Sequence, residues 1–263
     1  MADSSFALEF ALRPLDEVQP FTDGEGNPHV HWFALTDGTY DVRLDGQSIF
    51  EYSDAARAHF GLPDVAGVDY QVARLFHDLS WTFGDILDSP IPSEVHQWVS
   101  SPEALRSLFT AYRNAEGELR VVADSALGWL GGRTIDSGHL VQGPALAMWR
   151  HDDRVFAWCD ADDRRLEGAK VWAYSPLFTS TDAAAFEAEV RAFQEDLLEQ
   201  MDARIDLLER GRDPGLRASP DIVELRAQHA NEVKTAGERR VSQVPDWDHF
   251  ARSLATLTIT PGR

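Results

Sequence analysis

The hydrophobic period changes repeatedly along this chain, and these changes constrain its fold more than any single motif does. Residues 6–12 alternate large apolar side chains with alanine and glutamate, which is typical of a half-buried strand. Residues 182–210 instead repeat apolar side chains every three or four positions, which is typical of a long amphipathic helix. Strand and helix signals therefore occupy separate blocks, a segregation that favours an α+β fold over a doubly wound α/β fold.

The blocks follow one another in a simple order. They are strands over residues 5–52, helices over 53–130, strands over 133–175 and helices over 182–256. Asp-Gly pairs separate short alternating segments in the first block, so we expect an antiparallel meander there, with residues 29–35 as one strand. A helix opened by Asp69 is expected over residues 69–87. The second strand block is expected to be antiparallel as well. No linker-like stretch divides the blocks, which predicts a single α+β domain over residues 1–263.

The charge balance excludes some classes of partner. The chain has 24 Lys+Arg against 44 Asp+Glu, which gives a formal net charge of −20 at pH 7. Binding to nucleic acid or to anionic membranes depends on clustered cations, so we expect neither partner. A surplus of carboxylates instead attracts basic proteins. The surplus is concentrated early, because residues 1–100 contain 17 acidic residues and four arginines.

The cysteine content and the hydropathy of the sequence indicate the cellular compartment in which the protein is expected. Cys159 is the only cysteine, which excludes an intramolecular disulfide and fits a reducing cytoplasm. No apolar run reaches the roughly 20 residues needed to cross a bilayer. Residues 1–5 lack the positive charge of a secretory signal. We therefore expect a cytoplasmic protein, while the composition sets no oligomeric state.

His29 and His31 form the clearest metal-binding pattern in the sequence. Two residues apart on a strand, both imidazoles would project from the same face, a geometry that zinc or another transition metal uses. Asp37, at the turn that follows, is a candidate third ligand. The competing interpretation is two ordinary histidines on the polar face of an edge strand, because no further ligand stands at a characteristic spacing. A divalent metal at this pattern is the one cofactor that the sequence raises.

Patterns of nucleophilic catalysis and phosphate binding are missing from the sequence. Ser137 and His139 stand beside Asp136, but neighbours on one turn cannot form the nucleophile–base–orienter line of a triad. The G-x-S-x-G frame is also lacking. Gly131 and Gly132 stand outside the frame of a phosphate-binding loop. The sequence therefore assigns no catalytic residue and favours a protein without catalytic activity.

Three segments carry a resemblance to a known family. They are residues 31–40 (HWFALTDGTY), 69–75 (DYQVARL) and 136–144 (DSGHLVQGP). In this order they resemble the motifs of an uncharacterised bacterial family, the domain of unknown function number 5984. Ser137 and His139 stand where that family has threonine and tyrosine. The resemblance covers most of residues 6–210 and implies a bacterial cytoplasmic protein, but it implies no reaction, cofactor or catalytic residue.

The first two of these segments supply our candidate binding residues. These are Trp32, Asp37, Tyr40, Asp69, Tyr70 and Arg74. Their aromatic, carboxylate and guanidinium groups suit a shared polar pocket, if the fold brings the two segments together. Nothing in the sequence alone shows that it does.

Three functional hypotheses remain open. The favoured one is a non-catalytic, immunity-like binding module for a basic partner protein, with the N-terminal sheet and the first helices as the docking region. The alternative is an enzyme, such as a metal-dependent hydrolase, with its site near His29, His31 and Asp37. A homo-oligomeric structural subunit is the third. The acidic polar face of the helix at residues 182–210 is either a solvated surface or a second docking surface for a basic partner.

Overall fold

The computed structural model describes residues 5–22, 24–62, 67–174, 176–211, 216, 218, 220–242 and 245–259. Its strands are β1 (Phe6–Leu12), β2 (Phe21–Thr22), β3 (Pro28–His29), β4 (Asp37–Leu44), β5 (Gln47–Ser48), β6 (Val68–Gln71), β7 (Thr134–Asp136), β8 (Ala145–His151), β9 (Arg154–Asp160), β10 (Arg165–Leu166), β11 (Ala169–Lys170) and β12 (Leu177–Asp182). Its α-helices are α1 (Asp54–Phe60), α2 (Ala73–Leu87), α3 (Ser93–His96), α4 (Pro102–Asn114), α5 (Glu118–Leu127), α6 (Ala183–Glu209), α7 (Ile222–Gly237) and α8 (Trp247–Ile259). Short 3-10 helices are η1 (Leu15–Glu17), η2 (Ala34–Thr36) and η3 (Gly128–Arg133). The strands pair antiparallel and the helices lie between and after the strand blocks, so the α+β prediction is confirmed.

Several helices begin where their sequences provide a cap. The side chains of Ser53, Ser101 and Asp182 accept backbone N–H groups from the first turns of α1, α4 and α6. These caps satisfy donors that a helix leaves unpaired at its start. The longest helix, α6, ends at Glu209, within one residue of the predicted end.

The first sheet is built around β4. Strand β1 pairs with one edge of β4 along its whole length, and β5 and β6 pair with the other edge at its two ends. Strands β2 and β3 form a separate two-stranded sheet. The N-terminal strands are therefore antiparallel, as expected, but β1 pairs across the β2–β3 hairpin rather than with it.

The strand expected at residues 29–35 is wrong. Strand β3 ends at His29, and the chain then turns into η2. Local hydrogen bonds explain the turn, because Leu35 N–H donates to the His31 carbonyl and Thr36 N–H to the Phe33 carbonyl. Backbone groups bonded in this way are not free to join a sheet ladder.

Helix α2 starts later than the sequence predicts. Asp69 lies on β6, whose backbone pairs with β4, so the expected helix opening at Asp69 is wrong. The helix begins at Ala73, because the N–H groups of Val72 and Ala73 bond the carbonyl and hydroxyl of Thr36. Sheet pairing thus takes the first three residues of the segment at 69–87, whose apolar spacing is helical.

The second sheet has the strand order β12–β9–β8–β7, all antiparallel. It extends past the expected limit of residue 175, because β12 runs to the residue that caps α6. Its central strands alternate apolar side chains toward both faces, as in β8, where Leu146 and Met148 face one way and Ala147 and Trp149 the other.

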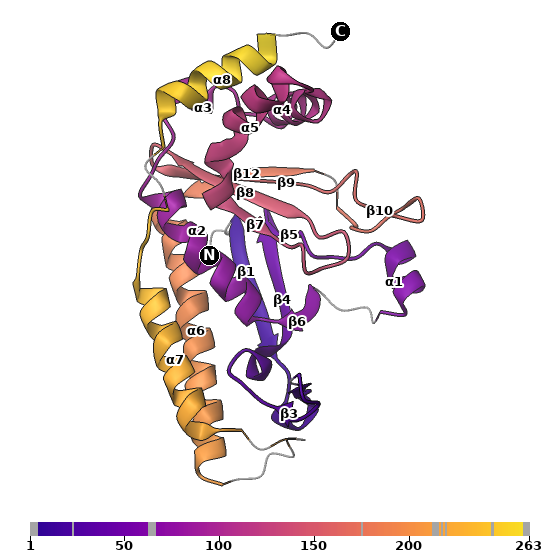
Figure 1. Cartoon of the computed structure of the whole chain (residues 1–263), viewed down its shortest axis with the longest axis vertical. Coiled ribbons are helices and arrows are strands. Elements are labelled where there is room, and N and C mark those ends of the chain that lie inside the picture. Colours follow the sequence, from indigo (N-terminus) through magenta and orange to yellow (C-terminus); the bar gives the residue numbers. More distant parts are fainter. Residues whose placement is uncertain are drawn as a thin grey trace.

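This sheet separates two hydrophobic cores (Figure 1). The first core lies among the two sheets, α2 and the long α6, which runs beside the first sheet. The second core lies between the other face of the second sheet and α3, α4, α5 and α8, which gather at one end of the molecule. The C-terminal helix α8 closes the second core with Leu254 and Leu257, both fully buried. Among the residues that the structure describes, no helix has the length and apolar character needed to span a membrane.

Candidate functional site

Parts of the chain that are far apart in sequence meet beside the first sheet. They are the middle of β4, the end of β6, the first turns of α2 and the loop after β7. Together they supply a group that we call the tyrosine–histidine cluster. Its members are Tyr40, Tyr70, Arg74, Asp78, Asp136 and His139. Tyr40 and Asp78 are buried and the other members are partly or fully exposed, so the cluster opens to solvent.

Strand pairing places the two tyrosines on one face of the first sheet. Gly38 of β4 stands opposite Tyr70 of β6, and Tyr40 follows two residues later on the same face. Gly38 has to be glycine because an added Cβ would lie 2.2 Å from the carbonyl oxygen of Ala11 on β1. The close approach of β1 therefore sets the position of the strand that carries Tyr40.

The charged members come from α2. Arg74 and Asp78 are one turn apart, and their Nε and Oδ2 atoms are 3.4 Å apart. His139 lies in a tight loop that Gly143 makes feasible, because an added Cβ there would lie 1.8 Å from the Ser137 carbonyl oxygen. Helix and loop thus converge on the tyrosine face of the sheet.

The centre of the cluster is a hydrogen bond between Tyr40 and His139. The phenol oxygen and Nε2 of the imidazole are 2.8 Å apart. The ring of Tyr70 covers the imidazole, with ring centroids 4.5 Å apart. Among the described residues, Nδ1 of His139 and Nε of Arg74 are buried without a hydrogen-bond partner. Both atoms are available to a ligand only if the cluster adjusts around it.

Burial changes the protonation of the cluster. It raises the pKa of Asp78 to about 6, although Arg74 and His77 pull that value down. It lowers the pKa of His139 to about 4, and the positive charge of Arg74 adds to the effect. It also raises the pKa of Tyr40 far above its ordinary value. At neutral pH the central pair is therefore a neutral phenol beside a neutral imidazole.

This protonation suits binding better than proton transfer. A general base works best when its pKa lies near the operating pH, and His139 lies well below it. The raised pKa of Tyr40 makes its phenol a weak acid. The partly exposed ring of Tyr70 and guanidinium of Arg74 provide stacking and charged hydrogen bonds. The geometry therefore fits recognition of a ligand or partner.

The structure brings together three of the six predicted binding residues, namely Tyr40, Tyr70 and Arg74. Trp32 lies apart from them, buried against α7, where its backbone N–H donates to Gln228 (2.8 Å) and its indole to Nδ1 of His229 (3.2 Å). Its role in the fold is to hold α7 in place.

Asp37 and Asp69 lie on the opposite face of the first sheet from the tyrosines. Both contact Arg13, Asp37 at 3.1 Å and Asp69 at 2.5 Å. The alternation of side chains along β4 and β6 explains the separation, because each aspartate stands one position from a residue of the other face. The sequence-based set therefore divides into two surfaces.

The predicted metal ligands are only partly together. The rings of His29 and His31 are 5.3 Å apart, and His31 also packs on Phe21. Asp37 is engaged with Arg13 instead, and the carboxylate that acts on His31 is Glu224. Within the described parts of the chain, no three His, Cys, Asp or Glu side chains form a group that could hold a metal ion. A metal at the two histidines stays a prediction.

Three members of the cluster are not among the binding residues predicted from the sequence, namely Asp78, Asp136 and His139. The helical spacing of Asp78 to Arg74 was a usable signal, because residues four apart share a helix face. His139 stands in the third motif segment, and its sequence neighbours Asp136 and Ser137 give no sign of a contact with Tyr40. Its long-range contact with Tyr40 is a consequence of how the two sheets pack.

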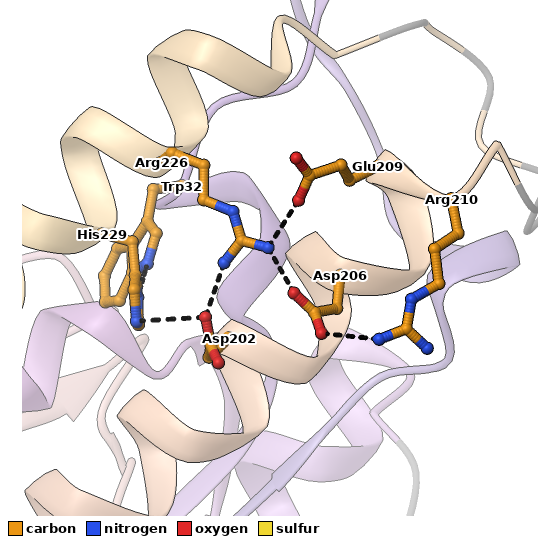
Figure 2. A network of polar contacts seen from close by, with 7 residues as sticks. All are labelled: Trp32, Asp202, Asp206, Glu209, Arg210, Arg226 and His229. Carbon is orange, nitrogen blue, oxygen red and sulfur yellow. Dashed lines mark hydrogen bonds and ion pairs between the residues drawn. The ribbon is translucent and has the colours of Figure 1, made fainter.

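The acidic face of α6 is used within the molecule. Figure 2 shows Arg226 of α7 reaching three carboxylates of α6. These are Asp202, at 2.6 Å, Asp206 and Glu209, at 2.8 Å. The same network ends at His229, which lies beside Trp32. Part of the surface that the sequence offers as a docking face therefore binds α7.

The family that the motif segments resemble is also the family found by comparison with protein families. The chain belongs to the family described as a family of unknown function, DUF5984, whose model matches residues 7–253. The match extends past residue 210, where the sequence resemblance ended, and includes α7 and most of α8. Comparisons with curated proteins and with solved structures give no match.

Proposed function

We propose that this protein is a non-catalytic, immunity-like binding protein that takes a basic partner protein on the outer face of the first sheet. This face, called the acidic sheet face below, carries alternate side chains of β1, β4 and β6 together with Arg13. Its charged members are Glu9, Arg13, Asp37, Asp41, Arg43 and Asp69.

The observation that carries the proposal is the shortage of cations on this face. Arg13 is shared by Asp37 and Asp69, and Arg43 is shared by Glu9 (3.1 Å) and Asp41 (3.5 Å). Four carboxylates therefore surround two guanidinium groups, and the charge of a third, that of Arg204, also acts on Asp37. A lysine or arginine from a partner would supply the positive charge that these carboxylates lack within the chain. Such charge complementarity favours fast and specific association.

Two of these carboxylates, Asp37 and Asp41, are poorly stabilised as anions. Burial raises the pKa of Asp37, with Arg13 opposing the rise and Asp69 adding to it. Burial also raises the pKa of Asp41, with Ser48 and Arg43 opposing. A nearby cation favours the ionised form of a carboxylate. Binding of a basic partner would therefore be favoured, because its cation would stabilise the ionised form that burial disfavours in these carboxylates.

The other strongly acidic surface is less free to bind. Arg226 already occupies Asp202, Asp206 and Glu209 on α6 (Figure 2). Glu187, near the start of α6, contacts Arg191 and Arg239. Helix α7 packs against this part of α6, and that packing directs the proposal to the sheet rather than to the long helix.

The test compares capture of basic proteins by immobilised variants of the full chain. Wild type is compared with D37N/D69N, and with E94Q/E116Q, which removes the same charge from exposed positions elsewhere. We expect wild type and E94Q/E116Q to retain one basic protein from a lysate of the native host. It should be released at about 1 M salt, where the Debye length is about 3 Å. D37N/D69N should lose it.

The captured protein is then purified and titrated against each variant. A dissociation constant raised by about tenfold or more in D37N/D69N alone, equivalent to about 1.4 kcal/mol, supports the proposal. Equal affinity for wild type and D37N/D69N, or an equal loss in E94Q/E116Q, would show that this face is not the docking surface.

A further inference from the structure

A cavity of about 340 Å³ lies between α4 and the face of the second sheet that carries the second core. Its walls come from α4, α5, η3, β7, β8, β9 and the turn after β9. None of its lining residues belongs to the tyrosine–histidine cluster or the acidic sheet face. The volume is near the lower end of the range for small-molecule sites, which is about 300–1,000 Å³.

The cavity exists because small side chains stand where large ones would fill the core. Ala145 and Ala147 of β8 face the helices, and Ala147 stands directly opposite Trp158 of β9. Gly131 of η3 adds no side chain on the other wall. The alternation of β8 thus places two methyl groups beside the broad ring of Trp158, and space remains between them and α4.

One wall of the cavity is aromatic and includes a tryptophan whose indole N–H is buried without a partner in the described part of the chain. The rings of Phe109 and Trp158 lie nearly parallel, with centroids 4.8 Å apart and planes inclined by 18°. Trp158 is 7% exposed, and its indole N–H has no hydrogen-bond partner among the described residues. A buried polar group without a partner is costly, so it marks a position where a ligand atom would be stabilised.

The lining of the cavity contains one more arginine than aspartates, and one of the arginines, Arg106, also contacts Glu103 outside the lining at 3.3 Å. The positive residues of the lining are Arg106, Arg113 and Arg164, and the negative ones are Asp160 and Asp163. Arg113 and Arg164 both face one carboxylate, Asp163, at 3.3 and 3.8 Å. These pairs are largely exposed and therefore weak. In a chain of net charge −20, a surplus of cations at a cavity mouth is a local exception.

We infer that this cavity binds a small, flat aromatic anion, such as an aryl carboxylate or sulfonate. The ring system would lie in the apolar space bounded by Phe109, Trp158 and the alanines of β8. The acidic group would face Arg113 and Arg164 at the rim, where guanidinium groups form strong charged hydrogen bonds with such oxygens. A polar ring substituent would accept the indole N–H of Trp158.

The test uses the fluorescent probe 1-anilinonaphthalene-8-sulfonate, which is an aromatic anion, with the folded full chain. Saturable binding to wild type is expected, with a dissociation constant raised by about tenfold or more in R113Q/R164Q. The matched control is R240Q/R252Q, which removes the same charge from exposed positions outside the cavity and should bind as wild type does. A145L, which fills the cavity, should also weaken binding.

Further readouts keep the test decisive. The neutral probe N-phenyl-1-naphthylamine lacks the sulfonate and should bind wild type and R113Q/R164Q equally. W158F keeps the aromatic wall but removes the indole N–H. It therefore separates the contribution of the hydrogen-bond donor to probe affinity from the contribution of the ring. Circular dichroism confirms that each variant is folded. An absence of saturable binding by the folded wild type, or an equal loss of affinity in R113Q/R164Q and R240Q/R252Q, would overturn the inference.

Discussion

At the scale of single residues, burial acts on Asp78 and His139 in opposite directions. Burial disfavours the charged form of any group, so it raises the pKa of the carboxyl group and lowers that of the imidazole. The pKa of Asp78 rises from 3.8 to about 6, and that of His139 falls from 6.5 to about 4. The two groups share one cluster and titrate over the same pH range, with opposite consequences for stability.

The signs follow from proton linkage. Between about pH 4 and 6 the folded state holds more protons at Asp78 than the unfolded state does, so this contribution to stability is lost as the pH rises. At His139 the unfolded state holds more protons over this range, so this contribution is lost as the pH falls. In the wild type the two slopes offset each other.

Single substitutions should separate these slopes. Relative to wild type, H139Q should become less stable as the pH rises from 4 to 6, and D78N should become more stable. Each difference should approach about 1.4 kcal/mol per pH unit, the value for one proton. Urea unfolding at several pH values measures both. Stability profiles of the two variants that run parallel to wild type would contradict the assignment.

At the scale of elements, the sequence predicts what local rules determine. Helix α6 falls within a residue of its expected bounds because its apolar stripe and its capping aspartate agree. Ser53 and Ser101 cap α1 and α4 through the same kind of local hydrogen bond. Strand β6 was missed because its pairing with β4 outweighs a helical spacing that continues into α2. Long-range pairing of this kind leaves no local pattern.

The candidate site shows the same limit. Tyr40, Tyr70 and Arg74 were selected from motif segments, and the structure brings them together. Asp37 and Asp69 belong to the same segments but face the other side, because side chains alternate along β4 and β6 and Asp69 lies on a strand rather than on the expected helix. Motif membership thus predicted the region of the cluster, and the fold decided its members.

The contact between α6 and α7 gives an element-scale prediction. In R226M, three α6 carboxylates lose their shared cation and face one another at helical spacings, which is unfavourable. We expect faster hydrogen exchange across residues 222–237, and a loss of stability of about 1–2 kcal/mol, since the pairs are exposed and individually weak. Hydrogen-exchange mass spectrometry measures the first effect and urea unfolding the second.

The control for this prediction is R210M. Arg210 contacts Asp206 from within α6 itself, one turn away, and leaves the link to α7 intact. Hydrogen exchange of R210M across residues 222–237 should match that of the wild type. If R226M and R210M change that exchange equally, the network stabilises the protein only through its overall charge balance, and Arg226 does not specifically attach α7 to α6.

At the scale of the whole molecule, the second sheet belongs to both cores. Leu146 and Met148 serve one core while Ala147 and Trp149 serve the other, so neither core can be lost without exposing the sheet. A shared sheet should couple the cores into one cooperative unit. The single domain expected from the sequence is therefore a prediction that unfolding can test.

Truncation of one buried leucine in each core provides that test. Leu197 of α6 belongs to the first core and Leu105 of α4 to the second, and both are fully buried. L197A and L105A should each cost about 2–5 kcal/mol. In both, far-UV circular dichroism and tryptophan fluorescence should report one coincident urea transition. Two transitions, with each variant shifting only one of them, would instead define two domains.

The position of α8 has a consequence for biosynthesis. Its residues Leu254 and Leu257 close the second core against α4 and α5, which are encoded more than a hundred residues earlier. A nascent chain therefore presents the apolar sides of α4 and α5 to the cell until residues 247–259 have left the ribosome. Chaperones recognise exposed apolar surface of this kind, and such surface also promotes aggregation. The emergence of α8, rather than that of either sheet, therefore completes the second core.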